Sequence, residues 1–250
     1  MEPYVKIHTK NEIGYIEFFH PAHNSLPSTL LSELARTITF AGEDDNIKVI
    51  VLKSGGDRTF CAGASFEELV AINDEESGKQ FFSGFANVIN AMRKCPKFII
   101  GRIQGKTVGG GVGLASATDY CMATTYAAIK LSELNVGIGP FVVGPAVQRK
   151  IGLSAMSQIA IDANTFYEAE WAMKKGLYTK LFGSIELLDD AVQSFAENLC
   201  NYNPKAMAEM KTMFWRGTED WDQLLMQRAK ISGRLVLSEF TKETLKRFKN

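Results

Sequence analysis

Two short runs of small residues are the parts of this sequence best suited to chemistry. They are residues 60–64 (FCAGA) and 109–113 (GGGVG), roughly fifty residues apart. Each run follows an apolar, strand-like stretch and begins a segment with helical periodicity. Small side chains let backbone N–H groups approach a ligand closely, and a helix N-terminus adds positive potential there. Two such turns held together would supply two N–H donors, the minimum for stabilising a developing oxyanion.

The histidines limit which acid–base chemistry is available. Only three occur, His8, His20 and His23, all near the N-terminus and none beside a nucleophile-elbow pattern. A Ser-His-Asp or Cys-His arrangement is therefore not indicated. Proton transfer has to rest mainly on carboxylates.

Strands alternate with helices in the segments that must position these turns. Alternating residues at 5–8 and 15–18 predict a hairpin, and the periodicity of 29–41 predicts a helix capped by Ser25 or Ser28. Further strands are predicted at 49–52, 98–103, 120–123 and 128–131, with a helix that ends before Pro96. From residue 155 onward the chain is expected to be helical, with breaks near residues 176, 183, 204 and 217. This order predicts an α/β core with helical packaging.

Composition narrows the function classes. The 250 residues suit one sizeable domain, or a domain with a small appendage, and 46% of them are apolar. Lys and Arg number 28, as do Asp and Glu, so neither nucleic acid nor a membrane is expected as a partner. The four cysteines are far apart and form no CxxC pair, so no metal site or disulfide framework is expected. The N-terminus lacks the pattern of a signal peptide, and a cytoplasmic location is expected.

Four segments together resemble the crotonase superfamily, the enoyl-CoA hydratases and isomerases. They are residues 20–26 (HPAHNSL), 60–64, 105–113 with Asp119, and 131–140, and their order and spacing agree as well as their residue types. The resemblance implies an α/β fold of stacked ββα units with a C-terminal helical region. Residues 1–185 would form the core that binds a CoA thioester and carries out catalysis. Residues 186–250 would pack subunits into a trimer or a dimer of trimers.

The resemblance also implies a catalytic arrangement. The backbone N–H groups of Ala64 and Gly110 would form an oxyanion hole for the thioester carbonyl; the alternative is that both turns only pack helices against strands. Glu133 stands where the family carries its second catalytic glutamate, after an apolar strand. In an apolar pocket its pKa would be raised, and it would serve as base and acid in turn. The alternative is a surface glutamate at the end of a strand.

Gly113 is the most consequential departure from the family pattern. Hydratases carry a glutamate there and use two carboxylates to activate one water, whereas moving a double bond needs one base. The sequence therefore favours isomerisation. Hydration of a 3-methylglutaconyl-CoA-type substrate stays open, as do decarboxylation, thioester hydrolysis and a non-catalytic role in acyl-CoA binding or scaffolding. Phe141 is a second departure, because hydratases often have glycine after the proline.

The resemblance implies further contacts to substrate. Ala22, His23 and Asn24 would meet the adenine and pantetheine, and Arg58 would face a phosphate, although Glu67 stands where the family often has a basic residue. The remaining substrate-binding candidates are Ala62, Gly63, Ser65, Phe66, Gly109, Gly111, Gly113, Pro140 and Phe141. An aromatic stripe would form either an acyl pocket or plain core, and it consists of Phe66, Leu69, Phe81, Phe82 and Phe85.

No tightly bound cofactor and no metal is expected, since coenzyme A would enter as part of the substrate. Asp119, after the glycine-rich helix, is expected to be structural. The C-terminal third is rich in apolar residues, which are expected to be buried between subunits: Met207, Met210, Met213, Phe214 and Trp215.

Overall fold

The N-terminal hairpin forms as its alternating sequence predicts. In the computed structural model, which describes residues 1–249, β1 (Tyr4–Lys10) pairs antiparallel with β2 (Ile13–Phe19). The two-residue turn between them has positive φ at both Asn11 (53°) and Glu12 (62°). Such a turn matches the twist of the strands, and asparagine tolerates its first position well.

The hairpin forms one edge of a six-stranded sheet. Its other strands are β3 (Val49–Ser54), β5 (Phe98–Ile103), β7 (Tyr120–Thr124) and β9 (Lys180–Phe182). The strand order is β1-β2-β3-β5-β7-β9, and every pair after the hairpin is parallel. Both faces of this sheet are covered. In β3, Ile50 and Leu52 belong to the main core, whereas Val49 and Val51 face a second apolar cluster.

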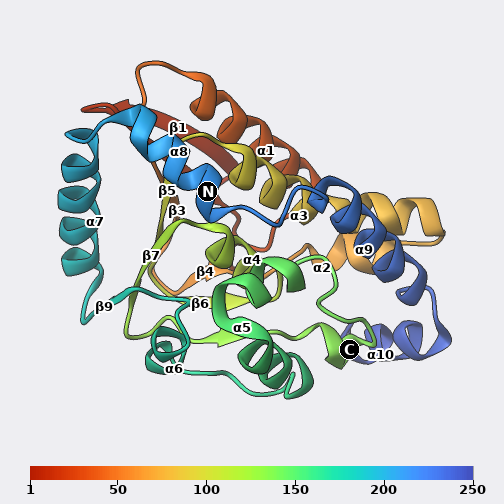
Figure 1. The fold of residues 1–250 in the computed structure, drawn as a ribbon. Coiled ribbons are helices and arrows are strands. Elements are labelled where there is room, and N and C mark those ends of the chain that lie inside the picture. Colours follow the sequence, from red (N-terminus) through yellow and green to blue (C-terminus); the bar gives the residue numbers. More distant parts are fainter. Residues whose placement is uncertain (250) are drawn as a thin grey trace.

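Helices form the layers on both faces (Figure 1). On the main-core side lie α1 (Ser28–Glu43), α3 (Glu75–Lys94), α4 (Gly110–Ala117) and α5 (Gly144–Ile161). Short α6 (Ala169–Lys174) packs there as well. The opposite face is covered by α7 (Ile185–Cys200), which stands apart at the left of Figure 1. Its Leu188, Val192 and Ala196 recur at helical spacing and pack on the sheet.

A small second sheet positions the candidate site. Its parallel strands are β4 (Thr59–Cys61), β6 (Lys106–Val108) and β8 (Ile129–Lys130), in the order β4-β6-β8. At their carboxyl ends, β4 leads into residues 62–64 and β6 leads into Gly109. Strand β8 leads, after two more residues, into Glu133. Because the strands are parallel, the three candidate segments lie at one edge of the small sheet.

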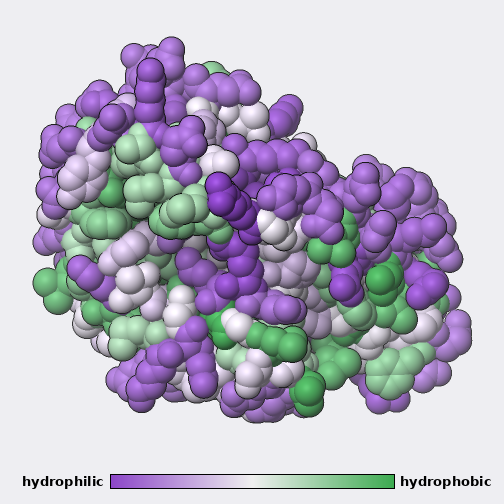
Figure 2. Space-filling view, viewed as in Figure 1, coloured by the Kyte–Doolittle hydropathy of each residue, from purple (hydrophilic) through white to green (hydrophobic). Residues whose placement is uncertain are grey.

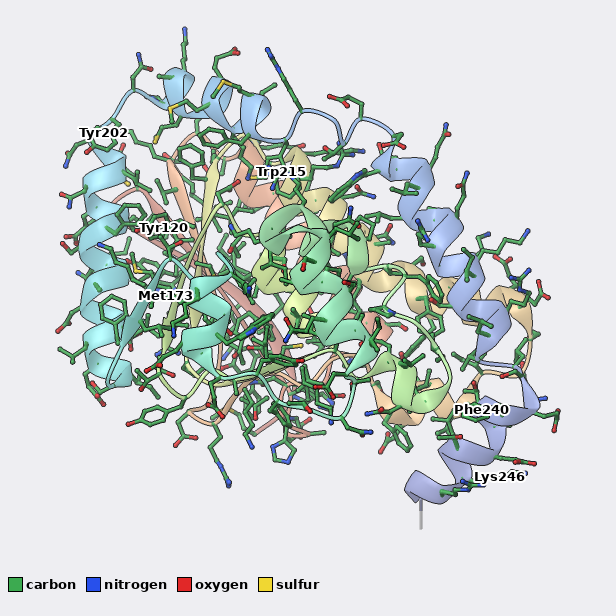
Figure 3. The ribbon with its side chains drawn as sticks, turned by 60° about the horizontal axis from the view of Figure 1, so that its bottom comes forward. Tyr120, Met173, Tyr202, Trp215, Phe240 and Lys246 are labelled. Carbon is green, nitrogen blue, oxygen red and sulfur yellow. The ribbon has the colours of Figure 1, made fainter. Side chains whose placement is uncertain are left out.

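The C-terminal helices return to the site. They are α8 (Pro204–Phe214), α9 (Trp221–Leu235) and α10 (Glu239–Lys249). Helix α9 crosses α3 at two glycines, where a β-carbon added to Gly78 would lie 2.8 Å from Gly233 Cα. The start of α10, marked by Phe240 in Figure 3, lies beside the 3₁₀ turn η1 (Glu133–Val136). Leu245 of α10 packs there against Ile138 and Val236.

Three features differ from the sequence-based expectations. The expected all-helical region contains the strand β9, a three-residue edge strand too short to give a period-2 signal. Helix α5 begins at Gly144, before residue 155. The first residue of α1 is Ser28, after Pro27, and no side chain caps it, so neither serine has the expected capping role.

The apolar residues of the C-terminal third divide into two groups. Met207 of α8 and Trp215, which directly follows α8, are buried within this chain, and Trp215 belongs to the main core. Met210, Met213 and Phe214 are about half exposed (44%, 51% and 46%). Figure 2 shows hydrophobic side chains gathered near α7 and α8 and again near α10, with further hydrophobic side chains near α5 at the bottom of the same face.

Candidate active site

A cavity of about 470 Å³ opens at the carboxyl ends of the small sheet. Most of its wall is apolar, with one carboxylate, Glu133, and one ammonium, Lys130, among the described residues that line it. The lining residues are Ala62, Gly63, Ala64, Phe66, Leu69, Phe81, Phe82, Phe85, Gly109, Gly110, Lys130, Ser132, Glu133, Asn135, Val136, Ile138, Gly139, Pro140, Phe141, Val142, Val143 and Ser232. The cavity therefore combines both glycine-containing turns with Glu133.

The N–H group of Ala64 is free to bind a ligand. Leu26 pairs with Ala64 in a parallel bridge, in which Leu26 N–H donates to Gly63 O (2.8 Å) and Ser65 N–H donates to Leu26 O (3.1 Å). This pattern uses the carbonyl group of Gly63 and the N–H group of Ser65, on either side of Ala64, and it turns the N–H group of Ala64 away from Leu26. No acceptor for that N–H lies within hydrogen-bond distance in the described part of the chain.

The second N–H group belongs to Gly110, the first residue of α4. The first N–H groups of a helix have no partner inside it, so this donor points out of the helix end. Gly109 before it has φ of +52°, and Gly63 has φ of +91°. A β-carbon at Gly63 would lie 3.6 Å from Gly110 N, so the two turns are in contact. Two N–H donors from different segments thus line one cavity.

Glu133 lies against the second turn. A β-carbon at Gly109 would be 3.2 Å from Glu133 Oε1, and Gly109 N–H donates to Lys130 O (2.9 Å), which ties this turn to β8. The residue is half-buried, and its Oε2 is fully buried without a hydrogen-bond partner. Burial raises the pKa of the carboxyl group from 4.5 to about 7, outweighing the opposite effect of nearby backbone groups. A group with this pKa can both accept and return a proton near neutral pH.

The aromatic stripe forms one wall of the cavity. Phe66 and Leu69 of α2 (Phe66–Ala71) and Phe81, Phe82 and Phe85 of α3 all line it, which favours the acyl-pocket interpretation over plain core. The ring of Phe85 presses on the second turn, since a β-carbon at Gly110 would lie 2.2 Å from Phe85 Cζ.

Two glycines expected to contact substrate are packed against other segments. A β-carbon at Gly111 would lie 2.7 Å from the carbonyl oxygen of Cys61, and one at Gly113 would lie 2.5 Å from Val143 Cγ1. Neither glycine lines the cavity. Their small size lets α4 approach β4 and α5, and contact between either glycine and a substrate stays a prediction.

Residues 22–24 form an exposed loop held by a buried asparagine. Ala22 and His23 are exposed, and His23 has φ of +55°. Asn24 is 3% exposed, and its amide donates to the carbonyl oxygens of Gly55 and Thr59 (2.8 Å each). Its side chain therefore holds the loop to β4, and contact between residues 22–24 and a substrate stays a prediction.

Two further predicted contacts lie outside the cavity. Ser65 caps α2, where its hydroxyl accepts a hydrogen bond from Glu68 N–H (3.3 Å). Arg58 is exposed on the loop before β4 and does not line the cavity. The other candidates, Ala62, Gly63, Phe66, Gly109, Pro140 and Phe141, do line it.

Several lining residues had no signal in the sequence. Ser232 comes from α9, about a hundred residues beyond Glu133, and no local pattern points to it. Lys130 and Val143 lie beside recognised segments, but their types suggested no role. Asn135 binds the carbonyl oxygen of Ala163 (2.8 Å) and fixes the turn after Glu133.

The described residues contain no cluster of three His, Cys, Asp or Glu side chains able to hold a metal ion. Asp119 is structural, as expected. It pairs with the buried Lys211 (2.8 Å) and accepts hydrogen bonds from Ile99 N–H (2.8 Å) and Trp215 Nε1–H (3.1 Å). Within residues 1–249, every helix is too short or too polar to cross a bilayer.

Comparison with known proteins shows the family to which the chain belongs. The sequence model of the enoyl-CoA hydratase/isomerase family matches residues 8–249. The peroxisomal Delta(3,5)-Delta(2,4)-dienoyl-CoA isomerase of Arabidopsis thaliana is 26% identical over 231 residues, 86% of this chain and 81% of the relative. The mitochondrial methylglutaconyl-CoA hydratase of Mus musculus is 28% identical over 200 residues, 78% of this chain and 63% of the relative.

Solved structures show the same fold. The enoyl-CoA hydratase from Bacillus halodurans superposes with a TM-score of 0.90 at 21% identity, covering 98% of this chain and 99% of the other. The fold is therefore the crotonase fold that the sequence resemblance implied. On the family match, this chain belongs to the enoyl-CoA hydratase/isomerase family of enzymes.

Proposed function

We propose that this enzyme stabilises the enolate of an acyl-CoA thioester and moves a double bond within the acyl chain. The observation that carries the proposal is Glu133, the one carboxylate among the described residues that line the apolar cavity, with its Oε2 buried beside two backbone N–H groups that have no partner in the described part of the chain. Both N–H groups belong to fixed turns, so they need no rearrangement to receive negative charge.

The proposed reaction uses Glu133 twice. Its carboxylate removes a proton from the acyl chain, and the electron pair of that C–H bond moves toward the thioester carbonyl. The carbonyl oxygen becomes an enolate oxygen, which accepts hydrogen bonds from Ala64 N–H and Gly110 N–H. The neutral Glu133 then returns the proton to a different carbon, which re-forms the carbonyl and leaves the double bond one position away.

The walls around Glu133 favour isomerisation over hydration. No second carboxylate lines the cavity within residues 1–249, and Val143 and Ile89 fill the space beside Gly113. A water near Glu133 would therefore have one carboxylate partner at most. Hydration of a 3-methylglutaconyl-type thioester is the second candidate, because a methylglutaconyl-CoA hydratase is among the relatives.

The acyl group is proposed to be an uncharged hydrocarbon chain. The wall formed by Phe66, Leu69, Phe81, Phe82 and Phe85 offers no partner for a charge, and burying an unpaired charge there would be unfavourable. Ser232 is the polar group that α9 contributes to this wall.

A panel of enoyl-CoA thioesters in D₂O, with products analysed by mass spectrometry, tests the reaction. Bond migration leaves the product mass unchanged apart from deuterium at exchanged positions, whereas hydration adds one water and decarboxylation removes carbon dioxide. Isomerised product supports the proposal, and it carries deuterium to the extent that the proton on Glu133 exchanges with solvent before it is returned. Hydrated product as the main outcome selects the second candidate, and no product from any thioester contradicts both.

We also propose a homotrimer or a dimer of trimers in the cytoplasm. The half-exposed Met210, Met213 and Phe214 of α8 supply apolar surface for subunit contact. Sedimentation at micromolar concentration is expected to give a trimer or hexamer, and a stable monomer would contradict this assembly.

A further inference from the structure

Ser232 places a hydroxyl group on an otherwise apolar face of α9. Leu225, Ala229 and Val236 lie on the same face, spaced three or four residues apart with Ser232 among them, and all three are buried. Ser232 is 1% exposed and lines the active-site cavity. At this position the spacing calls for an apolar side chain, so the hydroxyl group needs an explanation of its own.

The Ser232 hydroxyl group has no hydrogen-bond partner in the part of the chain that the structure describes. A serine or threonine inside a helix often bonds to the carbonyl oxygen one turn earlier, as Thr39 does to Ala35 O (3.1 Å), but Ser232 Oγ forms no such bond. Ser116 Oγ is unpartnered and fully enclosed, whereas Ser232 Oγ is not fully enclosed and opens onto the cavity. Water can pair this oxygen in an empty cavity, but an acyl chain that fills the cavity has to pair it itself.

The crossing of α9 and α3 fixes the position of this hydroxyl group. The two helices lie side by side (Figure 1). A β-carbon on Gly233 would lie 2.6 Å from Lys79 N, so the two backbones are in contact directly beside Ser232. A hydroxyl group on a helix held this closely is preorganised for a hydrogen bond.

Helix α3 also relates the hydroxyl group to the proposed oxyanion hole. The Phe85 ring lies against Gly110, and Gly78, seven residues earlier on α3, lies against Gly233. Seven residues of helix rise about 10 Å. An extended carbon chain advances about 1.3 Å per bond. With a hydrogen bond at each end, a chain whose carbonyl lies at Gly110 presents roughly its carbons 5–8 to Ser232.

We propose that Ser232 is a specificity residue for an acyl chain that carries one uncharged oxygen substituent, a hydroxyl or ketone group, beyond the reacting carbons. This inference rests on the proposed function, because it places the thioester carbonyl at Ala64 and Gly110. It refines the proposed hydrocarbon chain, whose remaining carbons contact the aromatic wall. A serine hydroxyl group both donates and accepts, so it can pair with either substituent.

Calorimetric titration with saturated acyl-CoA thioesters tests this pairing, since a saturated chain has no double bond to move. The ligands are octanoyl-CoA and four octanoyl-CoA thioesters with a single hydroxyl group at carbon 5, 6, 7 or 8. The wild type is expected to bind the best of the four at least as tightly as octanoyl-CoA. In Ser232→Ala, the Kd for that ligand is expected to rise about tenfold relative to the Kd for octanoyl-CoA, because the ligand's hydroxyl group is left unpaired against an apolar wall. The variant loses no hydrogen bond within the described chain, so it is expected to fold.

Ser116→Ala is the matched control. Ser116 is also 1% exposed with an unpartnered hydroxyl group, but it does not line the cavity, so this variant is expected to keep the wild-type ratio of the two Kd values. The same ratio in the wild type and in Ser232→Ala, for all four hydroxylated ligands, overturns the inference. If the protein isomerises enoyl thioesters while that ratio does not depend on Ser232, the inference alone fails. A ratio that depends on Ser232, in a protein that isomerises no thioester, supports the inference and contradicts the proposed reaction alone.

Discussion

A β-carbon at Gly113 would lie 2.5 Å from Val143 Cγ1 and 2.7 Å from Val143 Cβ. Val143 is branched at the β-carbon and follows a tight turn, so it has little freedom to move aside. Gly113→Ala is therefore expected to lower the free energy of unfolding by about 1–3 kcal/mol. Urea unfolding measures this loss, and adding Val143→Gly is expected to recover part of it.

Gly183→Ala serves as the control for this prediction, because a β-carbon there meets no atom within 4 Å. Its free energy of unfolding is expected to stay within about 0.5 kcal/mol of the wild type. An equally small effect for Gly113→Ala would show that α4 can move away from Val143, and it would contradict the close packing at this position.

Removing the Gly110 N–H is expected to slow turnover about 10²–10³-fold, the usual effect of losing one oxyanion donor. Phe85→Ala first makes room for a side chain at Gly110, and Gly110→Pro then removes the donor at a helix position that accepts proline. Gly110→Ala in the same Phe85→Ala background adds a β-carbon but keeps the N–H. Equal turnover of the proline and alanine variants would argue against an oxyanion hole at this position.

The buried pair of Asp119 and Lys211 is expected to be essential for stability. Their side chains are 7% and 2% exposed, so Asp119→Ala leaves Lys211 buried and unpaired, at a cost of about 3–5 kcal/mol. Asp222 pairs with Arg93 and Lys94 at the surface, and Asp222→Ala is expected to cost less than about 1 kcal/mol. Similar losses for the two variants in urea unfolding would contradict the structural role of Asp119.

The sequence predicted the residues proposed for the chemistry better than it predicted the residues that form the walls of the cavity. The two glycine-containing turns and Glu133 have local signals, because each stands at the end of an apolar strand. The structure brings all three to one edge of the small sheet. The hairpin was predictable from alternating residues and most other strands from short apolar runs, and both patterns are local properties of the sequence.

Long-range packing explains what the sequence did not reveal. Ser232 enters the cavity only because α9 crosses α3 at Gly78 and Gly233, which are about 155 residues apart in the chain. The sequence suggested that Asn24 and Gly113 touch substrate. Whether an asparagine amide turns inward, or a glycine packs against Val143, depends on segments that no local pattern places.

Stability is expected to fall as the pH rises through the titration of Glu133. Burial raises the pKa of the folded protein's carboxyl group to about 7, above its ordinary 4.5, so between these values the folded protein holds a proton that the unfolded chain has lost. The stabilisation that the protonated Glu133 provides amounts to at most about 3 kcal/mol. It is complete below about pH 4.5 and is lost by about pH 7. Glu133→Gln cannot ionise, so its advantage over the wild type in urea unfolding is expected to grow from pH 5 to pH 8. A constant difference would contradict the raised pKa.

The most direct test of the central claim is the rate of product formation and deuterium incorporation by Glu133→Gln in D₂O, on the enoyl thioester that the wild type turns over best. Glutamine keeps the size of the side chain but cannot take up the proton, so both rates are expected to fall at least about 10²-fold, while affinity for coenzyme A is retained. Glu67 is an exposed carboxylate beside Phe66, so Glu67→Gln is the control, and this variant is expected to keep wild-type rates. Wild-type rates in a folded Glu133→Gln protein would show that another group moves the proton and would contradict the proposed mechanism.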